Sequence, residues 1–462
     1  MDVPEWEVDD GSPSLREGVV GPVERVVVVG AGLAGLTAAN ALTHAGVDCV
    51  VLEARDRIGG RIHTVEVAGH PVDLGGSWIH MPVGNPLTAL TERAGIQRVS
   101  GDPTEQLSAY DCTAGRWLNA EEWEASLTMQ YEVFPQAQAE LADRLGPAAS
   151  MEDAISHFLA HERLAEDDMR RARQALHAVI EAEAADLASR QSLRWMWNED
   201  EFDGSYFGDL PVGGYRKIVS ALSSGVDVRL GVEVSAVSWT ASGVEIGTAS
   251  GPVERASHVV VTVPLGILKR GEPSFFPDLP PEHRAAIERL GFGRLEKLVL
   301  AFDEPFWQAS GVGHVVVFPP DAHEPAIWVL GLDSFGSGPI LEALLFHTSA
   351  ARTLHHSAQE NSDWLLELIG QALGHRCPDP VSIVSTSWTT DRHSGGAYTH
   401  ITPWGHPLDC DQLGQPVGGR VLFAGEHTQS ARLAYADGAL TSGIREAKRL
   451  LATPSVRLVL GE

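Results

Sequence analysis

The chain has 462 residues, of which 44% are hydrophobic and 21% charged, and 34 Lys and Arg against 62 Asp and Glu leave a formal net charge of -28. This composition is typical of a folded globular protein of two or three domains and excludes fibrous, disordered and small disulfide-stapled classes. An acidic surface repels nucleic acid, so we expect no nucleic-acid partner; the acidity serves solubility and is compatible with a cationic substrate.

The cysteines and the first residues bear on metal binding and location. The four cysteines are widely spread and form neither a CxxC pair nor a ligand cluster, so no metal site and no disulfide framework is expected: Cys49, Cys112, Cys377 and Cys410. The start, MDVPEWEVDD, is acidic and lacks the apolar run of a secretory signal. Glycines and polar residues interrupt the longest apolar stretch, residues 26–51, so we expect no membrane span and a cytoplasmic location.

The chain opens with a predicted leader followed by a βαβ unit. Residues 1–22 mix acidic residues with Gly, Ser and Pro, which predicts a mobile leader and ordered structure from near Glu24. The run RVVVVG, beginning at Arg25, then predicts a strand, LAGLTAANALTHAG a helix and VDCVVLEA a second strand. This order is the beginning of a parallel sheet.

The middle of the chain divides into a helical stretch and two groups of strands. Residues 119–205 are rich in Ala, Glu, Leu and Arg at helical spacing, so this stretch should be mostly helical. The segments VDVRLG, VSAVSW, GVEIGT and HVVVTVP predict strands that return to the first unit. Between residues 271 and 394, EKLVLAFD, HVVVFP, AIWVLGLD, LEALLFH and VSIVSTSW predict a second sheet, with one helix near DWLLELIGQALG. A strand, GRVLFAG, and a helix, DGALTSGIREAKRLLA, close the fold.

The glycines after the first strand predict a dinucleotide site. Gly30, Gly32 and Gly35 stand directly between strand and helix, where they permit a tight turn, a close approach to a pyrophosphate and tight packing of helix on strand. Glu53 ends the second strand eighteen residues later, near the spacing expected of the acid that binds ribose hydroxyls. A glycine pair followed by Arg61 could add a phosphate contact.

These motifs and several later segments resemble, in matching order, the flavin-containing amine oxidase superfamily, especially its polyamine oxidase and lysine-specific histone demethylase branch. The segments are RDRIGGRIHT, DLGGSWIHMPVGNP, GVEVSAV, VTVPLGILK and FAGEHT. The resemblance implies an α/β fold, with a discontinuous Rossmann-type FAD-binding domain over residues 23–80, 211–270 and 395–456. A substrate-binding domain of mixed sheet and helices would occupy residues 81–210 and 271–394, with the helical insertion at about 119–205.

The resemblance also implies cofactor contacts. Val234 would meet the adenine through its backbone, Glu426 the ribityl chain, and the helix after Tyr435 would point its N-terminus at the flavin. Ala397 stands where covalently flavinylated relatives carry cysteine, so FAD should be bound noncovalently. The residues expected to bind FAD are Gly30, Gly32, Leu33, Ala34, Gly35, Glu53, Ala54, Arg55, Gly60, Arg61, Gly75, Gly76, Ser77, Trp78, Val234, Pro264, Trp388, Gly425, Glu426, Ala434 and Tyr435.

Four residues are implied in catalysis. Lys297 matches the lysine that holds a water against flavin N5, and Trp388 a tryptophan beside the isoalloxazine ring. Tyr398 and Tyr435 match two aromatic positions that flank the substrate nitrogen. His80 and Trp78 would line the substrate cavity, although a lone histidine is as often structural.

The predicted activity is oxidative deamination of an amine. Hydride would pass from the carbon next to the nitrogen to flavin N5, water would hydrolyse the imine to an aldehyde, and oxygen would be reduced to hydrogen peroxide. The segments SWIH, GNP and FAGEHT and the acidity favour a polyamine or long-chain amine, whereas the tyrosine pair favours a small monoamine.

Two other classes remain open. An amino-acid oxidase or monooxygenase needs an arginine for the substrate carboxylate; Ser77 and Trp78 stand where many of them carry it, while Arg392 is another candidate. A flavin-bound chromatin or scaffold protein would need an extra arm or a basic surface, which the sequence lacks. The expected partners are a small amine and oxygen, with no membrane; the chain could be a monomer or a homodimer.

Overall fold

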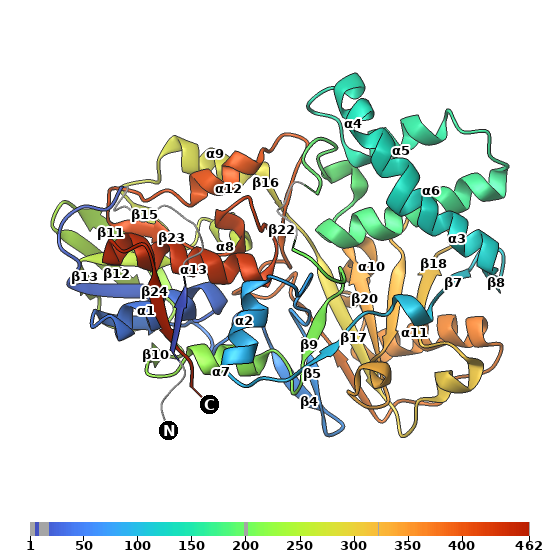
Figure 1. The fold of residues 1–462 in the computed structure, drawn as a ribbon, viewed down its shortest axis with the longest axis horizontal. Coiled ribbons are helices and arrows are strands. Elements are labelled where there is room, and N and C mark those ends of the chain that lie inside the picture. The colour runs from blue at the N-terminus through green and yellow to red at the C-terminus, as the bar shows by residue number, and fades with distance from the viewer. Residues whose placement is uncertain (1–4, 9–17, 198–201, 322, 462) are drawn as a thin grey trace.

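The computed structural model describes residues 5–8, 18–197, 202–321 and 323–461. The chain forms two halves side by side, one built around the N-terminal βαβ unit and one around a larger sheet with a group of helices above it (Figure 1). Among the described residues, none of the helices combines the length and the apolar composition that crossing a membrane requires.

A five-stranded parallel sheet carries the first half. Its order is β10 (Asp227–Arg229), β3 (Asp48–Leu52), β2 (Arg25–Val29), β14 (His258–Val261) and β23 (Val421–Phe423). The helix α1 (Leu33–His44) connects β2 to β3, which confirms the predicted βαβ unit. Because the strands come from three distant parts of the chain, this half is discontinuous, as expected.

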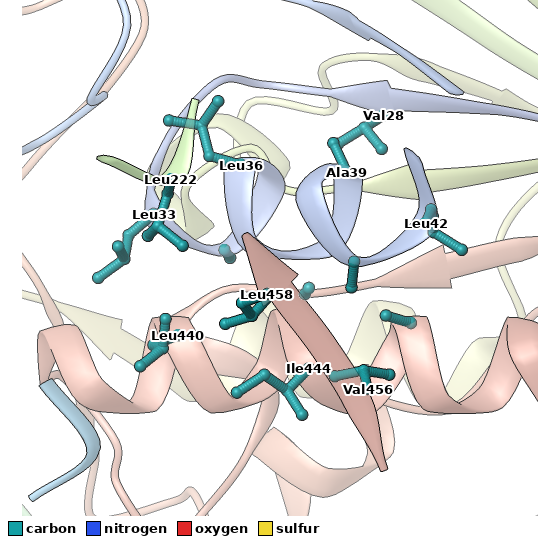
Figure 2. Packing of buried hydrophobic residues seen from close by; sticks show 14 of the residues in the cluster. Val28, Leu33, Leu36, Ala39, Leu42, Leu222, Leu440, Ile444, Val456 and Leu458 are labelled. Atoms are coloured by element: carbon teal, nitrogen blue, oxygen red, sulfur yellow. The ribbon is translucent and has the colours of Figure 1, made fainter. Parts of the chain in front are cut away.

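Helices α1 and α13 (Ala436–Leu451) pack side by side on the sheet, and strand β24 (Val456–Val459) crosses between them (Figure 2). Leu36, Leu440 and Ile444 are completely buried in this core. Gly443 lets the helices approach, since a Cβ there would lie 2.4 Å from the carbonyl oxygen of Ala34.

The prediction that residues 1–22 form a mobile leader is wrong for residues 5–8, which form a strand. Strand β1 (Glu5–Val8) pairs antiparallel with β24, and its Trp6 and Val8 are buried in the same core. Two apolar residues in a four-residue strand give too little alternation to be recognised among acidic neighbours. Residues 1–4 and 9–17 of the leader lie outside the described residues.

A small sheet completes this half. It includes residues beyond 271, where the sequence predicted that the substrate-binding domain resumes. Strands β11 (Val234–Thr240), β12 (Gly243–Thr248) and β13 (Glu254–Ala256) are antiparallel, and β15 (Ser274–Phe276) pairs parallel to β11. Helix α9 (Pro281–Arg289) packs on α12 (Pro407–Leu413) (Figure 1). The chain therefore leaves the first half only after α9. The sequence did not indicate this later boundary because β15, a three-residue strand in a proline-containing segment, gives no periodic signal.

The second half contains a seven-stranded sheet. Its order is β21 (Ser382–Ser385), β17 (Leu295–Ala301), β20 (Ile340–Phe346), β19 (Ile327–Gly331), β18 (His314–Phe318), β7 (Leu107–Asp111) and β8 (Arg116–Trp117). Helix α11 (Ala358–Leu373) packs against β17 and β21. The strands and the helix predicted between residues 271 and 394 are all present. Strand β16 (Leu290–Phe292) pairs with β22 (Thr399–Ile401) where the two halves meet.

The helical insertion is shorter than expected. It consists of α3 (Ala120–Thr128), the π-helix η2 (Met129–Val133), α4 (Phe134–Leu145), α5 (Met151–Leu159) and α6 (Glu166–Ala184). Helix α6 ends because Ala185 adopts a left-handed conformation with φ of 50°. Beyond it the described chain has only the short 3₁₀ turn η3 (Ala188–Arg190) and irregular turns up to Trp197, so the prediction is wrong there; residues 198–201 lie outside the described residues.

Candidate functional site

The carboxyl ends of β2 and β3 open into a cavity of about 540 Å³, here called the nucleotide cavity. Crevices at this edge of a parallel sheet are where α/β proteins bind nucleotides. Most residues predicted to bind FAD line it: Gly30, Gly32, Leu33, Ala34, Glu53, Ala54, Arg55, Gly60, Arg61, Gly76, Val234, Pro264, Gly425, Glu426, Ala434 and Tyr435.

The three glycines of the turn differ in their surroundings. A Cβ at Gly35 would lie 2.0 Å from the carbonyl oxygen of Gly30, so Gly35 packs helix on strand and does not line the cavity. A Cβ at Gly32, the residue before α1, would meet no atom within 4 Å. The space beside Gly32 is therefore open, and the N-terminus of α1 faces an anion placed there.

Glu53 organises the same edge of the sheet. Its carboxylate is buried and accepts hydrogen bonds from the backbone N–H of Ala31 at 2.7 Å and of Arg55 at 2.9 Å. Arg55 in turn forms an ion pair with Asp391. Glu53 thus holds the glycine turn against the end of β3, and its contact with a ribose stays a prediction.

The partly buried Arg61 and the buried Glu426 form an ion pair in the wall of the nucleotide cavity. Arg61 Nη1 donates to Glu426 Oε1 at 2.8 Å and to the carbonyl oxygen of Ala397 at 2.7 Å. Burial alone would raise the pKa of Glu426, but the charge of Arg61 and the hydrogen bonds from Arg61 and Thr399 hold it below its usual range. Glu426 therefore carries a negative charge at neutral pH.

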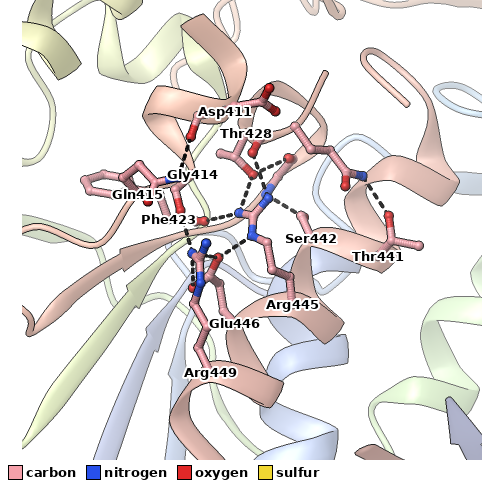
Figure 3. A network of polar contacts seen from close by, with 12 residues as sticks. Asp411, Gly414, Gln415, Phe423, Thr428, Thr441, Ser442, Arg445, Glu446 and Arg449 are labelled. Carbon is pink, nitrogen blue, oxygen red and sulfur yellow. Dashed lines mark hydrogen bonds and ion pairs between the residues drawn. The ribbon is translucent and has the colours of Figure 1, made fainter. Parts of the chain in front are cut away.

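A polar network fixes the segment that carries Glu426 to α13 (Figure 3). Arg445 donates to the carbonyl oxygens of Phe423 at 2.8 Å and Thr428 at 2.7 Å. Glu446 is completely buried between Arg445 and Arg449, at 2.5 and 2.9 Å. Both ends of the turn around Glu426 are thus held by one helix.

A second cavity, of about 290 Å³, adjoins the first and is here called the aromatic cavity. The two share residues near the N-terminus of α13: Arg61, Gly76, Ala397, Tyr398, Ala434, Tyr435 and Ala436. The remaining predicted residues line the aromatic cavity only: Gly75, Ser77, Trp78, His80, Lys297 and Trp388. All the predicted site residues except Gly35 therefore face one continuous region.

Lys297 is 2% exposed and lies in the wall of the aromatic cavity. Its Nζ donates to Ser77 Oγ at 2.7 Å and to the carbonyl oxygen of Asp73 at 2.9 Å, and forms an ion pair with Glu342 at 3.1 Å. Burial raises the pKa of Glu342 in spite of this ion pair, and raises that of Asp73 to about 6. Lys297 therefore pairs with the carboxylate of Glu342 and also fixes the backbone at Asp73.

Trp388 is fixed by a carboxylate that the sequence did not single out. Its indole N–H donates to the carbonyl oxygen of Leu74 at 2.8 Å. Glu296, which is completely buried, accepts from the backbone N–H of Trp388 and of Thr389, both at 2.8 Å. Glu296 is a positioning residue for the tryptophan.

The two tyrosines and His80 lie around the junction of the cavities. The Tyr398 hydroxyl donates to the carbonyl oxygen of Ala182 at 2.6 Å, so its ring is held by the end of α6. The rings of His80 and Tyr435 meet edge to face at 5.5 Å. Burial lowers the pKa of His80, whose Nδ1 lies 2.8 Å from the carbonyl oxygen of Tyr206, so this imidazole is neutral at pH 7.

Several cavity residues stand at positions that the sequence did not single out. Glu183 lines the aromatic cavity from the last turn of α6 and accepts a hydrogen bond from the hydroxyl of Tyr206. Phe207 and Trp328 add two further rings. Arg392, the alternative carboxylate ligand, instead lines the nucleotide cavity and forms an ion pair with Glu233.

Comparisons with known proteins agree with this architecture. The family described as flavin containing amine oxidoreductase matches residues 33–451. Lysine-specific histone demethylase 1 homolog 1 of Oryza sativa subsp. japonica is 32% identical over 93% of this chain and 52% of its own length; the Arabidopsis thaliana protein of that name is 31% identical over 92% and 52%. The chain thus spans about half the length of these relatives. A double mutant of putrescine oxidase has the same fold, with a TM-score of 0.75 at 22% identity, covering 94% of this chain and all of that one.

Proposed function

The chain belongs to the flavin-containing amine oxidoreductase family, and from this premise we propose that it oxidises a long-chain amine or polyamine with FAD and oxygen. The observation that carries the proposal is the aromatic cavity, which joins the nucleotide cavity at Tyr398 and Tyr435 and holds the carboxylate of Glu183. An aliphatic amine chain fits apolar walls, and a second cationic group is attracted to a carboxylate.

FAD is the cofactor of this family, and the nucleotide cavity fits it. The open space beside Gly32, the N-terminus of α1 and the buried carboxylate of Glu53 are the features that hold a pyrophosphate and a ribose. Ala397 has no thiol with which to form a thioether, so the cofactor is held noncovalently. Bound FAD supplies the acceptor for a hydride from the carbon next to the nitrogen, and oxygen takes the electrons to give hydrogen peroxide.

The protein's part is to orient a neutral amine, because a protonated nitrogen has no lone pair to assist loss of hydride. Tyr398 and Tyr435 would guide the nitrogen to the junction of the cavities through their rings. His80 stays neutral and adds no positive charge beside the nitrogen. The Nζ of Lys297 lies in the wall, paired with Glu342, and would stabilise negative charge that develops on the cofactor.

The charges of the cavity support an amine rather than an amino acid as substrate. Of its described residues, Arg61 and Lys297 are the cationic ones, apart from histidines, and each pairs with a buried carboxylate, Glu426 and Glu342. A carboxylate on the substrate would have to compete for them and would also face Glu183. An amino-acid oxidase is therefore disfavoured.

A second candidate is demethylation of a methylated lysine side chain in a peptide. The relatives at 31% and 32% identity named above favour it, since their names state that activity. A methylated lysine is also a long-chain amine, so the same cavity could accept it.

The test is a peroxide-coupled assay of the purified yellow protein. The panel contains spermine, spermidine, putrescine, benzylamine, L-leucine, and a lysine peptide with and without N-methylation. We expect turnover of the polyamines and none of L-leucine. Peroxide from the methylated peptide alone would instead establish the second candidate, and turnover of L-leucine alone would refute both.

A further inference from the structure

A third cavity adjoins the aromatic cavity. It has a volume of about 310 Å³, and its wall includes four residues that also line the aromatic cavity, Tyr131, Tyr206, Phe207 and Trp328. We call this space the outer chamber. The reaction proposed above assigns no part to the outer chamber.

The partition between the two spaces is built of aromatic rings. Phe207 stands between Tyr206 and Trp328, with ring centroids 5.6 and 6.0 Å apart. Tyr131 belongs to η2, a single π-helical turn of a kind that is frequent at functional sites, and is 56% exposed. Tyr206 is 43% exposed. Two of the four rings are thus accessible to solvent. The Tyr206 hydroxyl is held by Glu183, so a narrow chain that passes between the chambers would displace the ring of Tyr131.

The wall of the outer chamber combines apolar side chains with Asp102, Thr104, Gln130 and Ser205. Leu107, Trp123, Leu127 and Val316 contribute apolar surface, and among the described residues of its wall Asp102 alone is charged. Asp102 accepts hydrogen bonds from the backbone N–H of Thr104 at 2.9 Å, from the Thr104 hydroxyl at 2.6 Å and from the Ser205 hydroxyl at 2.5 Å.

Asp102 is therefore a fixed anion at neutral pH. Partial burial would raise its pKa, but the three hydrogen bonds outweigh burial and hold the pKa below its usual range.

We propose that the outer chamber is a binding subsite for the distal part of the substrate, where Asp102 holds a second cationic group. From the tyrosine pair the aromatic cavity holds Glu183 and the aromatic partition, and on the other side of the partition the outer chamber offers apolar walls and the carboxylate of Asp102. A linear amine with two or three nitrogens separated by methylene chains places charge and apolar segments in that order. The inference rests on the proposed function and adds to it that the enzyme selects substrates by length and by a distal charge.

The experiment compares two amines of similar length on the holoenzyme. Spermidine carries a distal cation, whereas decylamine does not. Asp102→Asn removes the charge and keeps the shape, and the exposed neighbour Glu105 provides the control, Glu105→Gln. Steady-state peroxide assays give kcat and KM for each amine, and anaerobic titration of the flavin absorbance with each amine gives binding separately.

We expect Asp102→Asn to lower kcat/KM for spermidine at least tenfold through KM, with decylamine unchanged, and Glu105→Gln to change neither. Leu127→Trp, which fills the chamber and leaves the charge in place, should lower kcat/KM for both long amines and spare butylamine. Equal effects of Asp102→Asn on spermidine and decylamine, or none on either, would overturn the subsite. A wild-type enzyme that oxidises none of these amines would instead refute the proposed function.

Discussion

In the glycine turn, one added methyl group should weaken cofactor binding without affecting folding. Gly32 has a φ of -75°, which alanine adopts without strain, and a Cβ at this position would meet no protein atom within 4 Å. Gly32→Ala should therefore leave the apoprotein as stable as the wild type, or more stable by about 0.4–1 kcal/mol because the unfolded chain is stiffer. The new methyl group would occupy the space expected to receive the pyrophosphate.

The loss of affinity can be worked from that contact. Forcing an extra carbon into a filled site costs about 1–3 kcal/mol, and each 1.4 kcal/mol is about a tenfold change in Kd. The Kd for FAD should thus rise about 5-fold to 150-fold. Titration of the stripped protein with FAD by flavin fluorescence, and urea unfolding of the same apoprotein, measure the two quantities separately.

Gly35→Ala is the matched control. Its Cβ would lie 2.0 Å from the carbonyl oxygen of Gly30 and 3.0 Å from Thr262 Oγ1, so α1 must move away from β2. We expect this variant to lose stability even without FAD. Wild-type affinity in Gly32→Ala, or equal loss of apoprotein stability in the two variants, would refute the view that Gly32 faces the phosphate and Gly35 the strand.

Substitutions at three further positions test the site and its support. Both carboxylate oxygens of Glu296 accept a backbone N–H, whereas glutamine has one acceptor oxygen. Glu296→Gln should therefore lower the free energy of unfolding in urea by about 1–3 kcal/mol. Burial raises the pKa of Glu181 to about 7, so the folded protein holds a proton that the unfolded chain releases, and stability should fall as pH rises from 4.5 through 7. Glu181→Gln should flatten that pH profile, and an unchanged slope would refute the assignment. Tyr398→Phe keeps the ring and should retain most of kcat, whereas Tyr398→Leu should lose it if the ring orients the amine.

The nucleotide half could be predicted because its signals are local. The valine run of β2, the glycine spacing and Glu53 all lie within about 30 consecutive residues, and each acts through its neighbours in sequence. Strand β1 could not be predicted in the same way. Its four residues form a strand only because β24, about 450 residues later, supplies the hydrogen bonds and the core that buries Trp6.

The cavity that is proposed to select the substrate depends on packing between distant elements, yet the sequence contains one signal for it. Glu183 follows Val179 by four residues and Ala175 by eight, so it lies on the face of α6 that is otherwise apolar. A carboxylate on such a face is costly unless the face opens to water or to a cation. Val179, Ala182 and Glu183 line the aromatic cavity, which satisfies that requirement. An acid at the end of an apolar helical face thus marks where a buried surface becomes a binding site, while the position of Asp102 beyond the aromatic partition is defined only once β7, η2 and β18 have packed together.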